Sequence, residues 1–140
     1  SREPGPPRAG KGIMQNKLRI FIADDDLEML RVMTMVLRDD GHEVETFTSG
    51  AELWRGIVAS MKSVDPVQLV ISDVRMPEFT GLDVSAGIQA AFFSVPVLLI
   101  SGFADEDVRS EAGRAGVRGV LAKPFSLDAF KAAVDQVLVH

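Results

Sequence analysis

Short apolar runs alternate with amphipathic stretches five times along this chain. The runs are too short for typical helices and rich in β-branched residues, which predicts strands buried in a sheet. The stretches between them repeat apolar residues at helical spacing, which predicts helices that pack one face on that sheet. The predicted strands cover residues 18–23, 43–47, 67–73, 95–100 and 118–122, and the predicted helices cover 27–40, 50–61, 81–93, 105–115 and 127–138.

Five strand–helix units in about 120 residues predict a doubly wound α/β fold, flavodoxin-like, with a five-stranded parallel sheet in the order 2-1-3-4-5. The polar alternation of residues 43–47 is typical of an edge strand. Helix-end signals support the boundaries: Gly41 ends the first helix, and Ser49 with Glu52 forms a capping box for the second. Ser126 caps the last helix. Helix 105–115 has few apolar residues and should be the least firmly held.

The composition describes one ordinary domain, which we place at residues 18–140. Of the 140 residues, 46% are hydrophobic and none is Cys, so disulfides and thiolate metal sites are excluded. No apolar stretch is long enough to span a membrane and no signal peptide precedes the domain, so we expect a cytoplasmic location without membrane contact. The net charge of −5 argues against nucleic-acid binding by this domain. Residues 1–17 are rich in Pro and Gly and are expected to be a flexible linker or a cloning remnant.

Polar residues of a particular kind follow four of the five predicted strands: Asp24 and Asp25, Asp73, Ser101 and Lys123. In the expected strand order the acidic pair and Asp73 face each other across the switch point of the sheet. Carboxylates about 4 Å apart repel by about 4 kcal/mol at an effective dielectric of 20, so the cluster needs a cation. Mg²⁺ suits it as a hard ion with oxygen ligands, and Lys123 adds a positive charge. Such a site is suited to hold a phosphoryl group.

Each of these residues also has a purely structural interpretation. Asp26 is most simply the N-cap of the first helix, and Asp24 and Asp25 could only supply negative charge at its start. Asp73 or Ser101 alone could begin a turn, and Lys123 alone could be a solvated strand end. These interpretations do not predict all of the residues together at strand ends, so their combination favours the phosphoryl site.

The residues now described resemble the receiver domain of bacterial two-component response regulators. The resemblance covers residues 18–139 and rests on the following segments: Asp24-Asp25-Asp26, Ser72-Asp73-Val74-Arg75-Met76-Pro77 with Gly81, Ser101-Gly102, and Lys123-Pro124-Phe125. It implies a cis peptide bond before Pro124.

The resemblance also implies a mechanism for a signalling domain rather than an enzyme. Asp73 would take a phosphoryl group from a phosphohistidine on a histidine kinase or histidine phosphotransfer protein. Asp24, Asp25, Asp73 and the main-chain carbonyl of Arg75 would hold Mg²⁺. Lys123 and Ser101 would contact the phosphoryl oxygens, and the domain would assist its own phosphorylation and dephosphorylation. The movement of Ser101 would repack helix 105–115, and a weak homodimer could form through the fourth helix, fifth strand and fifth helix.

The chain departs from the commonest family pattern at a few positions. Val120 stands where the family often has Tyr or Phe, so one part of the usual conformational switch is missing. Ser101-Gly102 replaces a frequent Thr-Ala pair. Arg75 and Phe103 occupy positions that influence phosphate lifetime in the family.

Other functions compete with this one. Asp24 and Asp26 match the Asp-x-Asp motif of Mg²⁺-dependent phosphohydrolases, although no cap domain and no second acidic pair accompany them. A pseudo-receiver that only binds a partner is a further alternative. Flavin binding is disfavoured because the loop after the first strand is acidic. Ser101-Gly102 and the Pro/Gly-rich residues 1–17 resemble features of receivers at the C-terminus of hybrid histidine kinases, which would make the parent protein a kinase.

Overall fold

A computed structural model describes residues 17–102 and 106–139 of the chain. It contains five strands and five helices in strict alternation, as predicted. In chain order these elements are β1 (Arg19–Ala23), α1 (Leu27–Asp39), β2 (Glu43–Phe47), α2 (Gly50–Met61), β3 (Leu69–Asp73), α3 (Gly81–Ala90), β4 (Val97–Ser101), α4 (Glu106–Arg114), β5 (Gly119–Ala122) and α5 (Leu127–Leu138).

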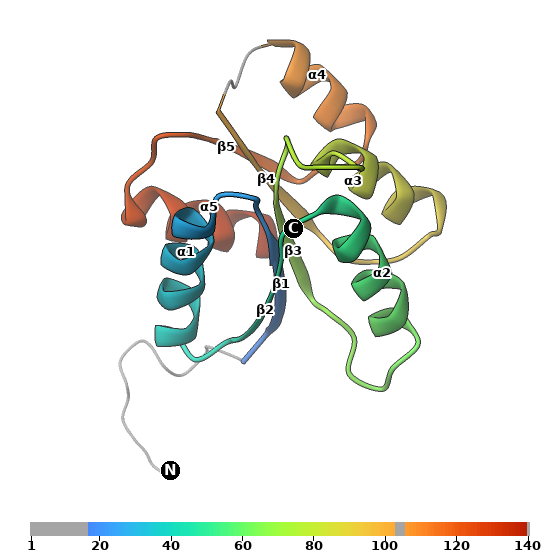
Figure 1. Ribbon diagram of the computed structural model, residues 1–140, viewed down its shortest axis with the longest axis horizontal. Helices are drawn as coiled ribbons and strands as arrows, with labels where there is room; N and C mark the ends of the chain where they lie inside the picture. The colour runs from blue at the N-terminus through green and yellow to red at the C-terminus, as the bar shows by residue number, and fades with distance from the viewer. Residues whose placement is uncertain (1–16, 103–105, 140) are drawn as a thin grey trace.

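The five strands form one parallel sheet in the order β2-β1-β3-β4-β5, which confirms the predicted topology (Figure 1). β1 lies between β2 and β3, and β3 lies between β1 and β4. The chain therefore reverses its direction of winding between β1 and β3. Ligands of such sheets bind beyond the carboxyl ends of the strands at this switch point.

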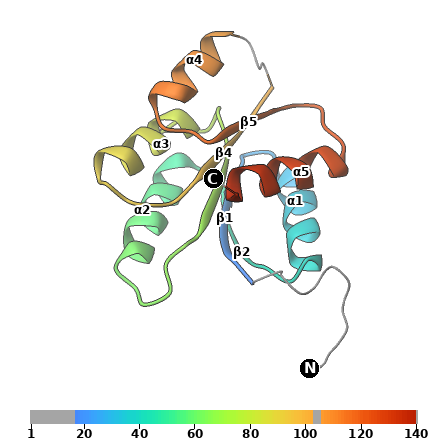
Figure 2. The ribbon, with the colours of Figure 1, turned by 180° about the vertical axis from the view of Figure 1, so that it is seen from behind.

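Helices cover both faces of the sheet, with α1 and α5 on one face and α2, α3 and α4 on the other (Figures 1 and 2). Side chains of a strand point alternately to the two faces. In β1, Ile20 and Ile22 pack toward α1 and α5, whereas Phe21 packs toward α2 and α3. Both faces are thus apolar, which explains why the central strands appear as continuous apolar runs in the sequence.

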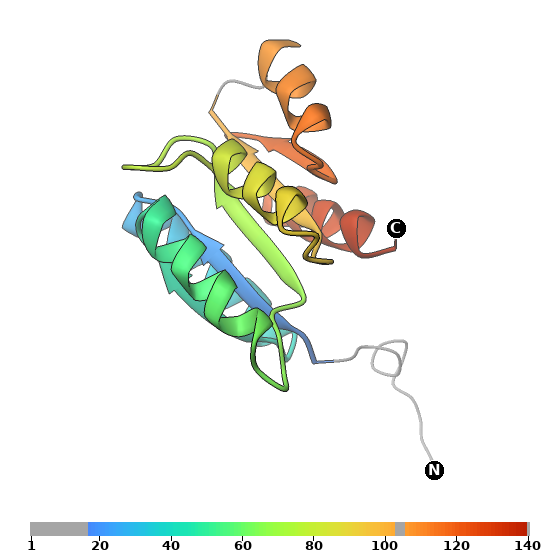
Figure 3. The same ribbon diagram turned by 90° about the vertical axis from the view of Figure 1, so that its right-hand side faces the viewer.

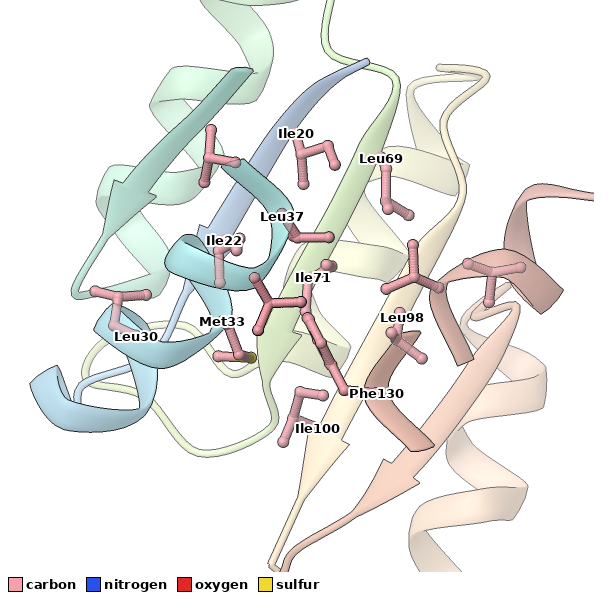
Figure 4. Packing of buried hydrophobic residues seen from close by; sticks show 14 residues of the cluster. Ile20, Ile22, Leu30, Met33, Leu37, Leu69, Ile71, Leu98, Ile100 and Phe130 are labelled. Atoms are coloured by element: carbon pink, nitrogen blue, oxygen red, sulfur yellow. The ribbon is translucent and has the colours of Figure 1, made fainter. Parts of the chain in front are cut away.

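The core under α1 and α5 contains the fully buried ring of Phe130 from α5. Figure 4 shows aliphatic side chains from three neighbouring strands meeting residues of both helices: Ile20, Ile22, Leu69, Ile71, Leu98 and Ile100 from the sheet, Leu30, Met33 and Leu37 from α1, and Phe130 from α5. Burying these side chains gives the main stabilisation of the sheet, on the order of 2 kcal/mol for each of them.

On the opposite face, α2 and α3 lie side by side across the sheet (Figure 3). Leu53 and Ile57 of α2 and Val84 and Ile88 of α3 are buried there. α4 contributes much less, since Ala112 is the one residue that it buries within the described part of the chain. This agrees with the expectation that the fourth helix has the weakest packing.

The structure corrects one helix boundary and one helix cap. α3 ends at Ala90 rather than at residue 93, because Phe92 adopts a positive φ of 60° and closes the helix in the position that glycine usually takes. The complete capping box lies at Thr80 and Asp83, whereas at Ser49 the hydroxyl accepts from the Glu52 N–H without a recorded return bond. The predicted caps at Asp26 and Ser126 are present.

Two strands begin two residues later than predicted, and β1 and β5 begin one residue later. β3 begins at Leu69 instead of residue 67, and β4 begins at Val97 instead of residue 95. Pro96 accounts for the second difference, because it has no N–H to donate to a neighbouring strand. The expected linker 1–17 lies, apart from Lys17, outside the described residues, as does Phe103. Among the described residues no helix has the length and apolarity needed to cross a bilayer.

One buried polar atom of the core has no partner. The Thr34 hydroxyl oxygen in α1 is buried and accepts or donates no hydrogen bond among the described residues. We predict that Thr34→Val increases the free energy of unfolding by about 1 kcal/mol, because it removes an unsatisfied polar group and keeps the β-branched shape. Urea denaturation measures this change. Thr34→Ser keeps the hydroxyl and loses the methyl group, so it should be less stable than the wild type; a Thr34→Val protein less stable than the wild type would contradict this interpretation.

Candidate functional site

The predicted polar residues meet at one edge of the sheet, because all five strands are parallel and end there. Asp24 follows β1, Asp73 ends β3, Ser101 ends β4 and Lys123 follows β5. The register places these ends level: Ala23 is opposite Ser72, Asp73 is opposite Ile100, and Ser101 is opposite Ala122. A sheet with slipped register could not bring these side chains together.

Three carboxylates form the centre of the site. Asp24, Asp25 and Asp73 each offer an oxygen, and these oxygens all lie within 4.8 Å of one another. Asp24 is fully buried and Asp73 is 6% exposed, whereas Asp25 is exposed to solvent. The cluster is therefore an acidic pocket that is open on one side.

Lys123 neutralises part of this charge. Its Nζ lies 3.4 Å from Asp24 Oδ2 and 3.3 Å from Asp73 Oδ2. One ammonium group thus joins the ends of β1, β3 and β5. The peptide bond between Lys123 and Pro124 is cis, as the resemblance implied.

Asp24 and Lys123 influence each other's protonation. Burial is the main cause that raises the pKa of Asp24 from 3.8 to about 6; the N–H of Asp26 opposes the rise, the charge of Asp73 adds to it, and Lys123 opposes it. For Lys123, burial alone would lower the pKa, but the charges and hydrogen bonds of Asp24 and Asp73 outweigh it and raise the pKa. The pocket thus strongly favours a bound cation, and Lys123 stays protonated.

Backbone and side-chain hydrogen bonds fix the two carboxylates. The N–H of Asp26 donates to Asp24 Oδ1 at 2.9 Å, and the N–H of Arg75 donates to Asp73 Oδ1 at 3.4 Å. The buried Ser72 hydroxyl donates to the carbonyl of Asp73 at 2.9 Å. Ser72 was part of the sequence motif, but its role in holding the backbone of Asp73 was not predicted. A polar residue inside an otherwise apolar strand was the available signal.

The loop after Asp73 is held by close backbone approaches at two glycines. The Gly81 N–H donates to the carbonyl of Val74 at 2.9 Å, and a Cβ at position 81 would lie 2.5 Å from the Asp73 carbonyl oxygen. At Gly50, a Cβ would collide with the carbonyl of Phe79, while the Gly50 N–H donates to the carbonyl of Pro77. The loop is therefore clamped between the sheet and the start of α2.

The remaining predicted residues lie as follows. Ser101 is buried at the end of β4, and its carbonyl accepts from the N–H of Lys123 at 2.8 Å. Arg75 is exposed beside the pocket. Asp26 lies outside the carboxylate cluster and accepts from the N–H groups of Glu28 and Met29, so its structural interpretation is confirmed. Val120 is half-buried in β5 and pairs with Leu99.

This arrangement can stabilise a tetrahedral anion next to one carboxylate. Asp73 is partly open and can act as a nucleophile, while Lys123 supplies a positive charge directly beside it. The three carboxylates fit a hard divalent cation by the nature of their donor atoms.

Several known proteins resemble this chain in sequence or in fold. The family model described as "Response regulator receiver domain" matches residues 20–135. Among solved structures, a receiver domain from Clostridium thermocellum matches with a TM-score of 0.77 at 26% identity, covering 87% of this chain and 94% of that one. The chemotaxis response regulator CheY4 of Vibrio cholerae gives a TM-score of 0.75 at 25% identity over 87% and 99% of the two chains.

Curated relatives match over a part of their length. The transcriptional regulatory protein GlrR of Escherichia coli is 34% identical over 119 residues, which is 85% of this chain and 26% of that protein. Nodulation protein W of Bradyrhizobium diazoefficiens is 30% identical over 124 residues, or 86% of this chain and 52% of that protein. The chain thus spans between a quarter and a half of these relatives.

A first prediction concerns Gly81. Gly81→Ala should lower the free energy of unfolding by about 1–3 kcal/mol, because the new methyl group would press on the Asp73 carbonyl and on Leu99. Gly113→Ala is the matched control: nothing lies within 4 Å of that position in α4, so it should be neutral or stabilise by up to about 1 kcal/mol. Chemical denaturation compares the two variants. Equal effects of both would show that the close approach at Gly81 is unimportant.

A second prediction follows from the raised pKa of Asp24 in the absence of divalent cations. Between the unfolded value of 3.8 and the folded value of about 6, the folded protein binds more protons, so stability falls as the pH rises through this range. Asp24→Asn should therefore match the wild type near pH 4 and exceed it at pH 7 by on the order of 1 to 3 kcal/mol. Denaturation in chelator at both pH values tests this. A variant that is less stable than the wild type at pH 7 would contradict it.

Proposed function

We propose a phosphorylation mechanism for this chain, which belongs to the response regulator receiver domain family of two-component signalling systems. Accepting a phosphoryl group is the general role of that family. We propose that Asp73 is the acceptor, because it is the carboxylate that ends the central strand, is partly open and has Lys123 beside it. The meeting of Asp73, Lys123 and the acidic pair at one edge of the sheet is the observation that carries this proposal.

The covalent step is a displacement at phosphorus. A carboxylate oxygen of Asp73 attacks the phosphorus of a phosphohistidine, and the bond between phosphorus and the imidazole nitrogen breaks with its electron pair going to that nitrogen. The products are an acyl phosphate on Asp73 and a neutral imidazole once the nitrogen lone pair is restored. The donor would be a histidine kinase or a histidine phosphotransfer protein, and the exchange would take place in the cytoplasm.

Asp24, Asp25, Asp73 and the main-chain carbonyl of Arg75 would hold Mg²⁺. The fit rests on the three clustered carboxylates and on burial of Asp24, which makes its charge costly without a cation. When bound, the ion would neutralise charge on the phosphoryl oxygens. The chain itself supplies the nucleophile and keeps it oriented through the Arg75 N–H and the Ser72 hydroxyl.

Lys123 and Ser101 would contact the phosphoryl group. Lys123 holds its proton because Asp24 and Asp73 raise its pKa above the lowering caused by burial, so it can pair with the oxygens of a phosphoryl group on Asp73. Ser101 ends β4, the strand next to Asp73, and would donate its hydroxyl to another oxygen. α4 follows Ser101 in the chain and buries few side chains. It is therefore the helix that such a contact would move most easily.

Three wider proposals follow from the family. The domain would assist removal of its own phosphoryl group, since the groups that favour transfer also favour attack by water. Two copies would associate weakly through the face formed by α4, β5 and α5. A transcriptional regulatory protein is among the relatives named above, so we propose that the parent protein is a response regulator, with the receiver at residues 18–140 after a linker 1–17.

The test is intact mass after incubation with acetyl phosphate. The wild type should gain one phosphoryl group in Mg²⁺, and chelator should lower the extent at least about a hundredfold. Asp73→Asn should gain none and should remain folded, since it removes a charge from an acidic pocket.

Asp26→Asn is the matched control from the same run of three aspartates. Asn caps a helix as well as Asp does, so phosphorylation should persist. Loss of phosphorylation in Asp26→Asn would instead favour the Asp-x-Asp phosphohydrolase, and an unchanged adduct in Asp73→Asn would refute the acceptor assignment.

A further inference from the structure

A groove runs along the outer flank of α1, away from the acidic pocket. It has a volume of about 540 Å³, and its lining includes Leu27, Arg31, Thr34, Met35 and Arg38 of α1 and Thr46 of β2. α1 contacts β1 and β2, whereas α5 contacts β4 and β5, so α1 lies between α5 and this groove. The groove therefore opens at the β2 edge of the sheet.

The groove combines apolar and basic side chains. Leu27 is 62% exposed and Met35 is 53% exposed. Arg31 and Arg38 are exposed and form no ion pair with any described residue; Arg38 donates one hydrogen bond to the carbonyl of Val44. Asp39 also lines the groove, one position beyond Arg38. Two guanidinium groups without an ion pair among the described residues, on a chain of net charge −5, fit an acidic partner.

The spacing of these residues defines what such a partner must present. Leu27, Arg31, Thr34 and Arg38 follow one another at intervals of four, three and four residues, so they form one ridge along the helix. A second helix that packs beside it needs acidic residues seven positions apart, with a small residue between them that lets the axes approach to about 8–10 Å.

The exposed side of α5 has this pattern. Asp128, Ala132, Asp135 and Val139 are all exposed and follow one another at the same intervals of four, three and four. Neither aspartate forms an ion pair with a described residue, and Val139 is 72% exposed. We call these four residues the α5 ridge.

We propose that the α1 groove binds the α5 ridge of a second copy of this chain, with the two helices antiparallel. In that direction every position of one set meets a suitable position of the other. Arg31 faces Asp135 and Arg38 faces Asp128, which gives two ion pairs. Leu27 faces Val139, which gives an apolar contact, and Ala132 lies over the buried Thr34 at the base of the groove, where the small alanine side chain permits close packing.

This contact is head-to-tail. The second copy's α5 lies on the far side of α1 from the first copy's own α5. The first copy's α1 lies between the two α5 helices, so a two-fold axis that exchanged these helices would pass through it. Both α1 helices would then occupy the same space, which excludes a symmetric pair. Each copy therefore keeps one free groove and one free ridge, and association is open-ended. This differs from the symmetric face of α4, β5 and α5 proposed above, in which the groove takes no part.

Sedimentation of two charge-reversal variants tests the proposal. One carries Arg31→Glu and Arg38→Glu, and the other carries Asp128→Lys and Asp135→Lys. The wild type should exceed the monomer mass of 15.2 kDa at concentrations up to about 1 mM, and less so at about 0.3 M salt than at about 0.05 M. Each variant alone should associate at least about tenfold more weakly, because like charges then face each other.

An equimolar mixture of the two variants gives the sharpest result. The first keeps its ridge and the second keeps its groove, and in the reverse contact the introduced carboxylates face the introduced ammonium groups, so the mixture should recover the open-ended association of the wild type. Arg55→Glu with Lys62→Glu is the matched control: both are exposed, lie seven residues apart at α2 on the other face, and change the net charge equally, so this variant should associate like the wild type. Ala132→Trp weakens the contact by bulk without any change of charge, and circular dichroism verifies that each variant folds.

Three results would overturn the proposal. The first is a wild type that stays monomeric at every concentration. The second is a mixture of the two variants that fails to associate, and the third is an Arg31/Arg38 variant that associates as the wild type does. The last result would point to the symmetric face of α4, β5 and α5 instead. Acetyl phosphate labelling of each variant is independent of these results, so a failure here leaves the assignment of Asp73 untouched.

Discussion

The position of Lys123 between Asp24 and Asp73 is the interaction on which the rest of the site depends. Lys123 joins the ends of β1, β3 and β5, although β4 separates β3 from β5 in the sheet. A buried carboxylate is costly unless a positive charge or hydrogen-bond donors surround it, and Asp24 is fully buried. The site is therefore stable only when β1, β3, β4 and β5 are aligned to within one residue. Aliphatic side chains on both faces of the sheet provide that alignment. If one strand slipped by one residue, the side chains that it presents to one face would move to the other.

Much of this could be predicted from the sequence because local signals and tertiary structure agree. Apolar runs that end on Asp73 and at Ser101 specified buried parallel strands and their functional ends. The run Asp24-Asp25-Asp26 was harder, since spacing alone assigns no role to three consecutive carboxylates. The structure separates them by direction: Asp24 points into the pocket, Asp25 remains exposed beside it, and Asp26 turns back to cap α1.

The features that sequence could not give all arise where segments distant in the chain approach each other. The carbonyl of Phe79 lies against Gly50, and the hydroxyl of Ser72 turns to the Asp73 carbonyl. No local pattern encodes either contact. The end of α3 was misplaced for a related reason: Phe92 and Phe93 continue an apolar pattern, yet Phe92 takes a left-handed conformation that ends the helix. The groove on α1 likewise forms between residues distant in the chain, because Thr46 of the edge strand β2 completes its lining.

The proposed response to phosphorylation and the proposed association involve different faces of the sheet. Ser101 leads into α4 on one face, whereas the α1 groove and the α5 ridge both belong to the other. α1 begins three residues after Asp24, and its N-cap Asp26 donates its N–H to the Asp24 carboxylate. This hydrogen bond links the acidic pair to the start of α1, where Leu27 and the groove begin. If phosphorylation shifts the start of α1, then by thermodynamic reciprocity head-to-tail association must change the affinity of the pocket for its ligands by the same factor. If it does not, the two faces act independently, and α4 alone transmits the signal.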